Sequence, residues 1–311
     1  MIGIDWGTTS FRAFRVTRDG TIRDRRISPR GIMHVPDARF GDTLREEIGP
    51  WLAAGEEHVL LSGMIGSRQG WVEAPYLPCP AGLPDLAAAL IDIPFDWAKV
   101  KLVPGLSGID SSGVPEVMRG EETQVLGIPS LIRSGGLACL PGTHSKWVTV
   151  EGGRITGFTT HMTGEVFAAL RGHTILGRMM RDGPPGTPFG GAPFEAGLRR
   201  SADPGGLLHH LFGVRSRALT GELAETDSPA YLSGLLIGHE IRAALGRGGH
   251  AEGPAEPSSG AERPVVQVIG EPDLTDLYAA AITASGGFAE RHDGQAAARG
   301  LALIADHATW S

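Results

Sequence analysis

The chain has 311 residues, 41% of them hydrophobic, and a formal net charge of -7 at pH 7. This length allows a large core and two domains, whereas the negative charge argues against a sequence-independent nucleic-acid binder, which needs clustered Lys and Arg. Apolar stretches stay shorter than the roughly 20 residues of a membrane span, and the first residues lack a signal-peptide pattern, so we expect a cytoplasmic protein without nucleic-acid or membrane partners.

The first elements are an apolar strand, a Gly-Thr turn and a second strand. The strand 2–6 leads into Gly7-Thr8-Thr9-Ser10, the second strand covers 11–16, and Asp19-Gly20 makes a further turn. Glycine lets backbone N–H groups approach an anion closely, and Thr hydroxyls add donors without bulk. This turn therefore predicts a phosphate contact.

The rest of the first half alternates helices and strands around a Gly-rich stretch. Periodicity and turn residues predict helices over 42–54 and 85–90, buried strands over 58–62 and 100–104, a Gly-rich stretch over 63–71 and a helical region over 115–126. We place a domain boundary near Val117.

A second Gly-Thr hairpin follows that boundary. Leu137–Leu140 is apolar, Gly142-Thr143-His144 forms the turn, and strands are predicted over 147–150 and 154–160. Two such turns in one chain indicate a phosphate chain that is held from two sides.

The remaining elements end in a third candidate nucleotide contact. The patterns predict a helix over 164–180, a Gly/Pro-rich loop over 182–197, a helix over 230–245, a mobile loop over 246–264, a buried strand over 265–270 and a helix over 274–284. The contact consists of Gly270 and Glu271, where the buried strand ends.

The order of these three segments is more specific than each one alone. An early Asp-x-Gly-Thr-Thr, a second Gly-Thr turn and a late apolar strand ending in Gly resemble the phosphate-1, phosphate-2 and adenosine segments of the actin, hexokinase and Hsp70 superfamily. P-loop, dinucleotide-fingerprint, Gly-x-Ser-x-Gly and His-Glu-x-x-His motifs are absent. The resemblance implies an α/β fold of two ribonuclease-H-like domains with an interdomain active-site cleft, 1–117 with the phosphate-1 turn and 118–311 with the phosphate-2 turn.

Longer blocks resemble one family of sugar-acid kinases. The blocks are Gly63–Tyr76, Cys79–Ala81, Val117–Gln124, Leu140–Trp147 and Met162–Glu165. They are similar to the 2-dehydro-3-deoxygalactonokinase family. This implies ATP-dependent phosphorylation of the 6-hydroxyl of 2-dehydro-3-deoxy-D-galactonate in D-galactonate catabolism, by a monomer or homodimer.

The nucleotide-binding residues follow from the turns. Phosphoryl transfer requires mainly alignment and charge neutralisation. Asp5 beside a triphosphate predicts a Mg²⁺ between them, held through water; its alternative role is to accept N–H groups of its own hairpin. Lys146 or Arg12 would supply positive charge. The other expected ATP contacts are Gly7, Thr8, Thr9, Gly142, Thr143, Ser145, Gly270 and Glu271.

The acceptor hydroxyl needs a base and a polar pocket. Gly120-Glu121-Glu122 matches the position where many sugar kinases of this superfamily carry Gly-Asp. Glu121 is therefore our first candidate for the base, and Glu122 and Asp110 are the next candidates. Both glutamates also suit a first helical turn for electrostatic reasons alone. The expected substrate contacts are Gly66, Ser67, Gln69, Trp71, Glu73, Tyr76, Arg119, Thr163 and Glu165.

Two other functions fit the turns. A kinase of the same fold could act on another sugar, polyol or carboxylic acid. A nucleotide-gated binding protein of the actin or Hsp70 type would hydrolyse ATP slowly without sugar and would not need the polar segment Gly66–Tyr76.

Overall fold

The computed structural model describes residues 1–18, 20–183, 189–246 and 264–310. The chain forms two compact units. Unit 1 comprises Met1–Ala138, Val148–Phe158 and His292–Ser311, and unit 2 comprises Cys139–Trp147 and Thr159–Arg291. The contiguous domains 1–117 and 118–311 stay a prediction. Among the described residues, no helix is long and apolar enough to cross a membrane.

Unit 1 is built on a six-stranded mixed sheet of order β3-β2-β1-β4-β8-β7. Strand β1 pairs antiparallel with β2 and parallel with β4, and β4 pairs parallel with β8. The strands are β1 Ile2–Trp6, β2 Phe11–Val16, β3 Ile22–Ser28, β4 His58–Ser62, β7 Ile91–Ile93 and β8 Lys99–Leu102. The predicted first hairpin and the strand over 58–62 are confirmed.

Alternating apolar side chains of β2 bury both faces of this sheet. Phe11 belongs to the core cluster that α1 (Phe40–Ala53) also fills, whereas Phe14 packs with residues of α10 (Ala296–His307). Successive side chains of a strand point to opposite faces, so the two clusters lie on opposite sides of β2. The carboxyl ends of β1 and β4, which carry candidate site residues, are therefore anchored by a core on both faces.

A small second sheet in unit 1 corrects one sequence-based prediction. Residues 115–118 were predicted to be helical, but Pro115–Met118 forms strand β10, which pairs antiparallel with β9 (Gly105–Ile109). Strand β5 (Tyr76–Pro78) completes this sheet. Pairing with β9 outweighs local propensity here, and the helix α3 covers only Glu121–Val125.

Short elements connect the sheets of unit 1. They are the 3₁₀ turns η1 Ile32–His34, η2 Pro36–Ala38 and η3 Met64–Gly66, the strand β6 Ala81–Gly82, and the helices α2 Leu83–Ala88 and α4 Pro129–Ser134. The helix predicted over 85–90 thus begins and ends two residues earlier.

A third sheet has the order β15-β14-β11-β12-β13-β6. Its strands are β11 Gly136–Leu140, β12 Ser145–Glu151, β13 Arg154–His161, β14 Val265–Ile269 and β15 Phe288–His292. The two six-stranded sheets share one connection pattern. In the first sheet β1, β2 and β3 lie side by side in chain order and β4 pairs with the free edge of β1; in the other sheet β11, β12 and β13 lie side by side and β14 pairs with the free edge of β11. The two Gly-Thr turns therefore connect equivalent strands of two similar sheets.

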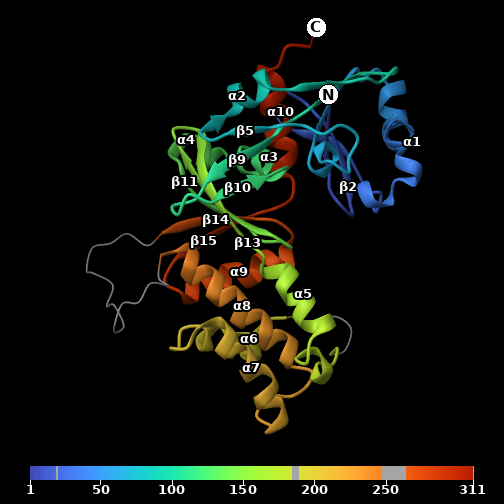
Figure 1. Ribbon diagram of the computed structural model, residues 1–311. Coiled ribbons are helices and arrows are strands. Elements are labelled where there is room, and N and C mark those ends of the chain that lie inside the picture. The colour runs from blue at the N-terminus through green and yellow to red at the C-terminus, as the bar shows by residue number, and fades with distance from the viewer. Residues whose placement is uncertain (19, 184–188, 247–263, 311) are drawn as a thin grey trace. The chain divides into compact units, whose positions relative to one another are not determined.

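Helix α8 is the centre of the helical part of unit 2 (Figure 1). It contacts α5, α6, α7 and α9. The helices are α5 Thr163–His173, α6 Gly191–Arg200, α7 Gly206–Leu219, α8 Ser228–Ala244 and α9 Pro272–Ala284; η4 covers Gly177–Met179. A Cβ at Gly234 would lie 2.0 Å from the carbonyl oxygen of Phe194, so glycine permits the close approach of α6 and α8.

Two further predictions were partly wrong. The helix predicted over 164–180 ends at His173, and α6 lies partly inside the loop predicted over 182–197. Phe194 and Leu198, one turn apart, are buried, and this burial stabilises α6 despite its glycines. The loop predicted over 246–264 and the turn at Asp19 fall mostly outside the described residues.

Candidate functional site

The first Gly-Thr turn is supported from behind by the segment that follows β3. The N–H of Gly7 donates to the carbonyl oxygen of Ser10 at 2.9 Å, and the N–H of Met33 donates to that of Thr8 at 3.1 Å. A Cβ at Gly31 would lie 2.3 Å from the carbonyl carbon of Thr9. Thr8 and Thr9 remain exposed. The turn is thus held in place while Thr8 and Thr9 stay accessible, as a phosphate contact requires.

Asp5 lies at the end of β1, opposite Arg12 in the hairpin register. Its Oδ2 is 3.6 Å from Nη1 of Arg12. Burial raises the pKa of Asp5, and the nearby Arg12 opposes this shift. A Cβ at Gly63, where φ is +92°, would lie 3.1 Å from Oδ1 of Asp5. Glycine therefore keeps this side of the carboxylate free of side-chain atoms.

The carboxylate of Asp5 fits a magnesium ion that is bound chiefly by phosphates and water. Among the described residues, no group of three or more His, Cys, Asp and Glu side chains could hold a metal. Mg²⁺ in nucleotide sites typically takes one or two carboxylates together with phosphates and waters. One carboxylate at the end of β1 agrees with that donor set.

Helix α3 begins next to Asp5 and presents two glutamates in different surroundings. Gly120 has φ +106°, and a Cβ there would lie 3.0 Å from Cα of Gly63. Oε2 of Glu121 accepts the N–H of Arg119 at 2.9 Å. Oε2 of the fully buried Glu122 accepts the N–H of Gly120 at 2.7 Å, and its Oε1 has no hydrogen-bond partner among the described residues.

Burial dominates the protonation of Glu122. Desolvation and the neighbouring Glu121 raise the pKa of Glu122 to about 8. This side chain therefore keeps its proton at neutral pH. The third carboxylate considered, Asp110, accepts the N–H groups of Ser112 and Val114 at 2.8 and 2.9 Å and so caps a turn.

The Gly-rich stretch after β4 folds around the side chain of Arg119. The N–H of Ala74 donates to the carbonyl oxygen of Gly66 at 2.9 Å, which closes the stretch into a loop. Nη2 of Arg119 donates to the carbonyl oxygen of Ala74 at 2.8 Å, and its guanidinium lies 4.4 Å from the centre of the Tyr76 ring. Four predicted substrate residues, Gly66, Ser67, Tyr76 and Arg119, therefore lie together.

The other predicted residues of this stretch lie apart from that cluster. Trp71 packs edge to face on Phe95 within the core of unit 1. Gln69 is exposed, and the exposed Glu73 pairs with Arg68 at 3.2 Å. Substrate contacts by Gln69, Trp71 and Glu73 stay predictions.

The second Gly-Thr turn packs on the first turn of α5. The N–H of Glu165 donates to the carbonyl oxygen of Thr143 at 3.0 Å, and the Glu165 carboxylate contacts the His144 ring. A Cβ at Gly164 would lie 2.5 Å from the carbonyl oxygen of Gly142. Helix α5 thus fixes the backbone of the turn and leaves Thr143 exposed.

The residues after this turn point inward. Nζ of the buried Lys146 donates to Oγ1 of Thr160 at 2.9 Å. The hydroxyl of Ser145 lies 2.9 Å from that of Tyr278, which donates to Glu240 at 2.6 Å; burial and Glu240 raise the pKa of Tyr278. Phosphate contacts by Ser145 and Lys146 therefore stay predictions, and in this structure both side chains bond to protein groups.

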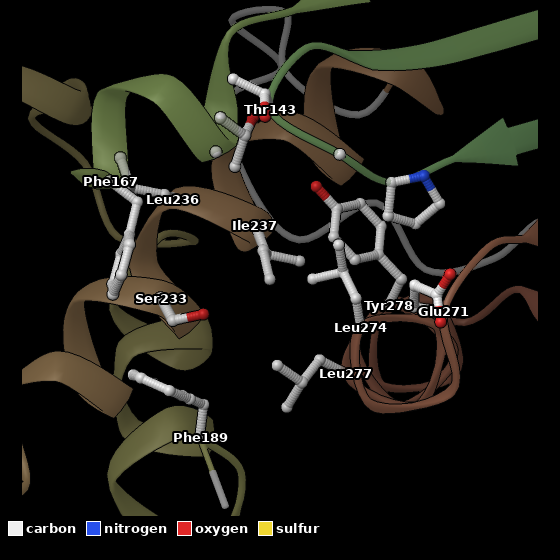
Figure 2. A pocket seen from close by; sticks show the side chains of 14 residues that line it. Thr143, Phe167, Phe189, Ser233, Leu236, Ile237, Glu271, Leu274, Leu277 and Tyr278 are labelled. Atoms are coloured by element: carbon white, nitrogen blue, oxygen red, sulfur yellow. The ribbon is translucent and has the colours of Figure 1, made fainter. Parts of the chain in front are cut away.

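A cavity of about 460 Å³ opens beside this turn. Figure 2 shows Thr143 at one end and Phe189 at the other, with Phe167 and Leu236 on one wall and Leu274 and Leu277 on the opposite one. Drug-sized ligands bind cavities of this size that are mostly apolar with a few polar groups. The lining residues are Pro141, Gly142, Thr143, Thr163, Gly164, Phe167, Phe189, Ser233, Leu236, Ile237, Glu271, Leu274, Leu277 and Tyr278.

Some residues that line this cavity were predicted from the sequence as ligand contacts, and others were not. Gly142, Thr143 and Glu271 were expected at ATP and Thr163 at the substrate, and all four line the same cavity. The apolar walls from α5, α8 and α9 were missed. Their side chains follow the helical pattern of core residues, which carries no signal for a ligand.

Comparisons with known proteins give one consistent result. The model of the family described as 2-keto-3-deoxy-galactonokinase matches residues 5–304. A protein of Rhizobium meliloti (strain 1021), described as a probable 2-dehydro-3-deoxygalactonokinase, is 35% identical over 308 residues, which cover 99% of this chain and 96% of that protein. The 2-dehydro-3-deoxygalactonokinase of Escherichia coli (strain K12) is 35% identical over 240 residues, or 77% and 78% of the two chains.

Solved structures agree with these relatives. A crystal structure from Sinorhizobium meliloti, described under the same enzyme name, has a TM-score of 0.83 and 34% identity and covers 98% of this chain and 97% of that one. Component A of the Acidaminococcus fermentans (R)-2-hydroxyglutaryl-CoA dehydratase has a TM-score of 0.50 at 12% identity, with 99% of both chains covered, and shows the fold alone. The predicted α/β fold of two ribonuclease-H-like domains is confirmed.

We predict that Glu122 makes the free energy of unfolding depend on pH. The folded protein keeps a proton on Glu122 up to about pH 8, whereas the unfolded chain loses it near pH 4.5. The contribution of this proton is complete below pH 4.5 and is lost as pH rises to about 8. In urea denaturation at pH 5, 6, 7 and 8, Glu122→Gln should gain stability relative to wild type with rising pH, by on the order of a few kcal/mol.

The exposed Glu57 provides the control for this measurement. Glu57→Gln should follow the wild-type pH dependence. Parallel curves for wild type and Glu122→Gln would contradict the protonated, buried state of Glu122.

Proposed function

Because the chain belongs to the 2-keto-3-deoxy-galactonokinase family, we propose that it transfers the γ-phosphoryl group of ATP to the 6-hydroxyl of 2-dehydro-3-deoxy-D-galactonate, a step of D-galactonate catabolism. The observation that supports this most directly is the cavity of unit 2, where a Gly-Thr turn closes one end of an apolar chamber. A nucleoside triphosphate matches this cavity, because its flat base can lie against the apolar walls while its phosphates reach the Gly-Thr turn.

In this proposal the adenine lies between the apolar walls of the cavity. Phe167 and Leu236 would contact one side of the base, and Leu274 the other, since these side chains face one another across the chamber. Glu271, which lines the cavity at the start of α9, would contact the ribose hydroxyls. The N–H groups around Gly142 and Thr143 would bind phosphate oxygens, because a glycine turn lets the backbone approach an anion.

Unit 1 carries the first Gly-Thr turn, which is its proposed phosphate contact, and the proposed metal contact. Gly7, Thr8 and Thr9 would donate to phosphate oxygens, and Arg12 would add positive charge from its place opposite Asp5. Asp5 would hold Mg²⁺ through water. When bound, this ion neutralises the charge that the phosphate oxygens carry during transfer. Lys146 remains a candidate for the same task in unit 2.

Glu121 is our proposed base. The reaction forms a bond between the substrate O6 and the γ-phosphorus, breaks the bond between that phosphorus and the β,γ-bridging oxygen, and moves the hydroxyl proton to the carboxylate. Glu121 follows the glycine that packs on Gly63 next to Asp5, and its side chain is only half-buried. Glu122 suits the role less well, because its proton is already present at neutral pH.

The reaction is tested by ADP release with Mg-ATP and a panel of acceptors. The panel contains the galactonate- and gluconate-derived 2-keto-3-deoxy acids, glycerol, simple hexoses and acetate. We expect stimulation by 2-dehydro-3-deoxy-D-galactonate, with phosphate at C6 of the product by NMR. Stimulation only by a neutral sugar would reject the acid substrate, and stimulation by none would favour a nucleotide-gated binding protein.

A Glu121→Gln variant tests the base. The amide can still accept the N–H of Arg119 but cannot take up a proton, so kcat should fall at least tenfold while the KM for ATP and for the sugar acid stays within twofold. Asp110→Asn, in the turn between β9 and β10, is the control and should keep kcat. An unchanged kcat in Glu121→Gln would remove this residue from the role.

A Ser233→Phe variant tests the nucleotide cavity. Ser233 lines the chamber from α8, and a phenyl ring there would occupy the space assigned to the adenine. We expect ADP affinity, measured by calorimetry without sugar, to fall at least tenfold. Leu208→Phe, at an exposed position of α7, is the matched control. Equal ADP affinity in a Ser233→Phe protein that melts like wild type would show that ADP binds elsewhere.

A further inference from the structure

Arg119 is a buried cation with most of its donors unused. Only 8% of the residue is exposed, and Nη2 donates to the carbonyl oxygen of Ala74. Nε and Nη1 are buried and have no hydrogen-bond partner among the described residues. These two atoms carry three of the five guanidinium N–H groups. Leaving buried charged donors unpaired is costly, so proteins rarely retain them without a ligand or ordered water.

Ser67, the residue after Gly66, contributes another unused buried polar atom. Its Oγ is buried without a partner among the described residues, and the residue is 9% exposed. The neighbouring Gly66 packs directly on the guanidinium, because a Cβ there would lie 3.1 Å from Nη1. A side chain at position 66 would therefore press on the guanidinium of Arg119.

Tyr76, Glu121 and Glu122 are the other neighbours of Arg119. Tyr76 stacks on one face of the guanidinium at 4.4 Å and is 42% exposed. The side chain of Glu121 bonds to the backbone N–H of Arg119. Glu122 acts on Arg119 through its charge only when ionised, and burial raises the pKa of Glu122 to about 8. At neutral pH the protonated Glu122 therefore adds no negative charge beside the Arg119 guanidinium.

We propose that Arg119 and Ser67 bind the carboxylate of the sugar acid, and that this pair makes the enzyme reject neutral sugars. This inference rests on the proposed function, since it assigns one group of that substrate. A guanidinium donates charge-assisted hydrogen bonds to a carboxylate, and the Ser hydroxyl adds one neutral bond. A substrate without the carboxylate would leave the buried donors unpaired, which is the situation that gives strong discrimination.

The test compares the sugar acid with its carboxamide, which has the same shape without the charge. Wild type should lose at least 10³-fold in kcat/KM on the carboxamide. Arg119→Met should lose at least 10²-fold on the acid and less than fivefold on the carboxamide, so that the acid-to-amide ratio falls. Arg119→Lys should recover part of the ratio, and Ser67→Ala should lower it by about tenfold.

Two controls separate this role from a structural one. Arg68→Met removes the neighbouring arginine, which is 83% exposed and pairs with Glu73, and should leave the ratio unchanged. ADP affinity should match wild type in every variant that is compared, and the melting temperature should not fall below that of wild type, since loss of the unpaired Arg119 donors can raise it. The readout is the ratio, because a distorted site would lower kcat/KM for both compounds alike.

The outcomes distinguish this inference from the proposed function. An equal loss on acid and carboxamide in Arg119→Met, with wild type active on the acid, would overturn the carboxylate assignment alone. Inactivity of wild type on the acid would overturn the function. In that case the affinity for the sugar acid, measured by calorimetry on wild type and Arg119→Met, still tests the carboxylate assignment. Equal affinities of the two proteins would refute it.

Discussion

The close approach of backbone at Gly63 and Gly120 is the constraint on which the candidate site of unit 1 depends. A Cβ at Gly120 would touch Cα of Gly63, and a Cβ at Gly63 would touch both the Trp6 backbone and the Asp5 carboxylate. Both glycines have positive φ, which other residues adopt only with strain. Because these glycines leave room, the end of β1, the end of β4 and the start of α3 meet. The close contact of the two glycines also positions the residues that flank them, which are Ser67 after Gly63 and Arg119, Glu121 and Glu122 around Gly120.

The buried polar groups of the two units differ in whether their hydrogen bonds are satisfied by the protein. In unit 2, Glu240 accepts hydrogen bonds from Trp147 and Tyr278, and Tyr278 also contacts Ser145. This network is satisfied by protein groups and can hold β12, α8 and α9 together without a ligand. In unit 1, Arg119 keeps two buried polar atoms without a partner among the described residues, and Ser67 and Glu122 keep one each. Satisfied networks stabilise a fold, whereas unsatisfied ones need a substrate, a proton or water to complete them.

Sequence reasoning succeeded where a pattern has one structural meaning. The Gly-Thr turns predicted the hairpins, and the resemblance carried by the order of the three segments implied the fold class. Gly66, Ser67, Tyr76 and Arg119, which were expected at the substrate, lie together, and their substrate contacts stay predictions. Sequence reasoning failed where tertiary contacts decide. Pro115–Met118 pairs as a strand although the region reads as helical, and α6 forms in a Gly/Pro-rich segment because Phe194 and Leu198 are buried. The walls of the unit 2 cavity could not be predicted, since a leucine that lines a chamber has the same spacing as one that fills a core.

The adjacent glutamates of α3 show what the fold adds to a motif. Sequence gives two carboxylates in one helical turn and no means of choosing between them. Successive helix residues point about 100° apart, so one of the two can face the core while the other does not. Glu122 is the buried one, and its carboxyl group, protonated at neutral pH, accepts the N–H of Gly120 and so supports the backbone from which Glu121 extends. The same turn thus separates a carboxyl that holds the glycine geometry from the half-buried one that we propose as the base, and the difference arises from helix geometry and burial, because the two side chains are chemically identical.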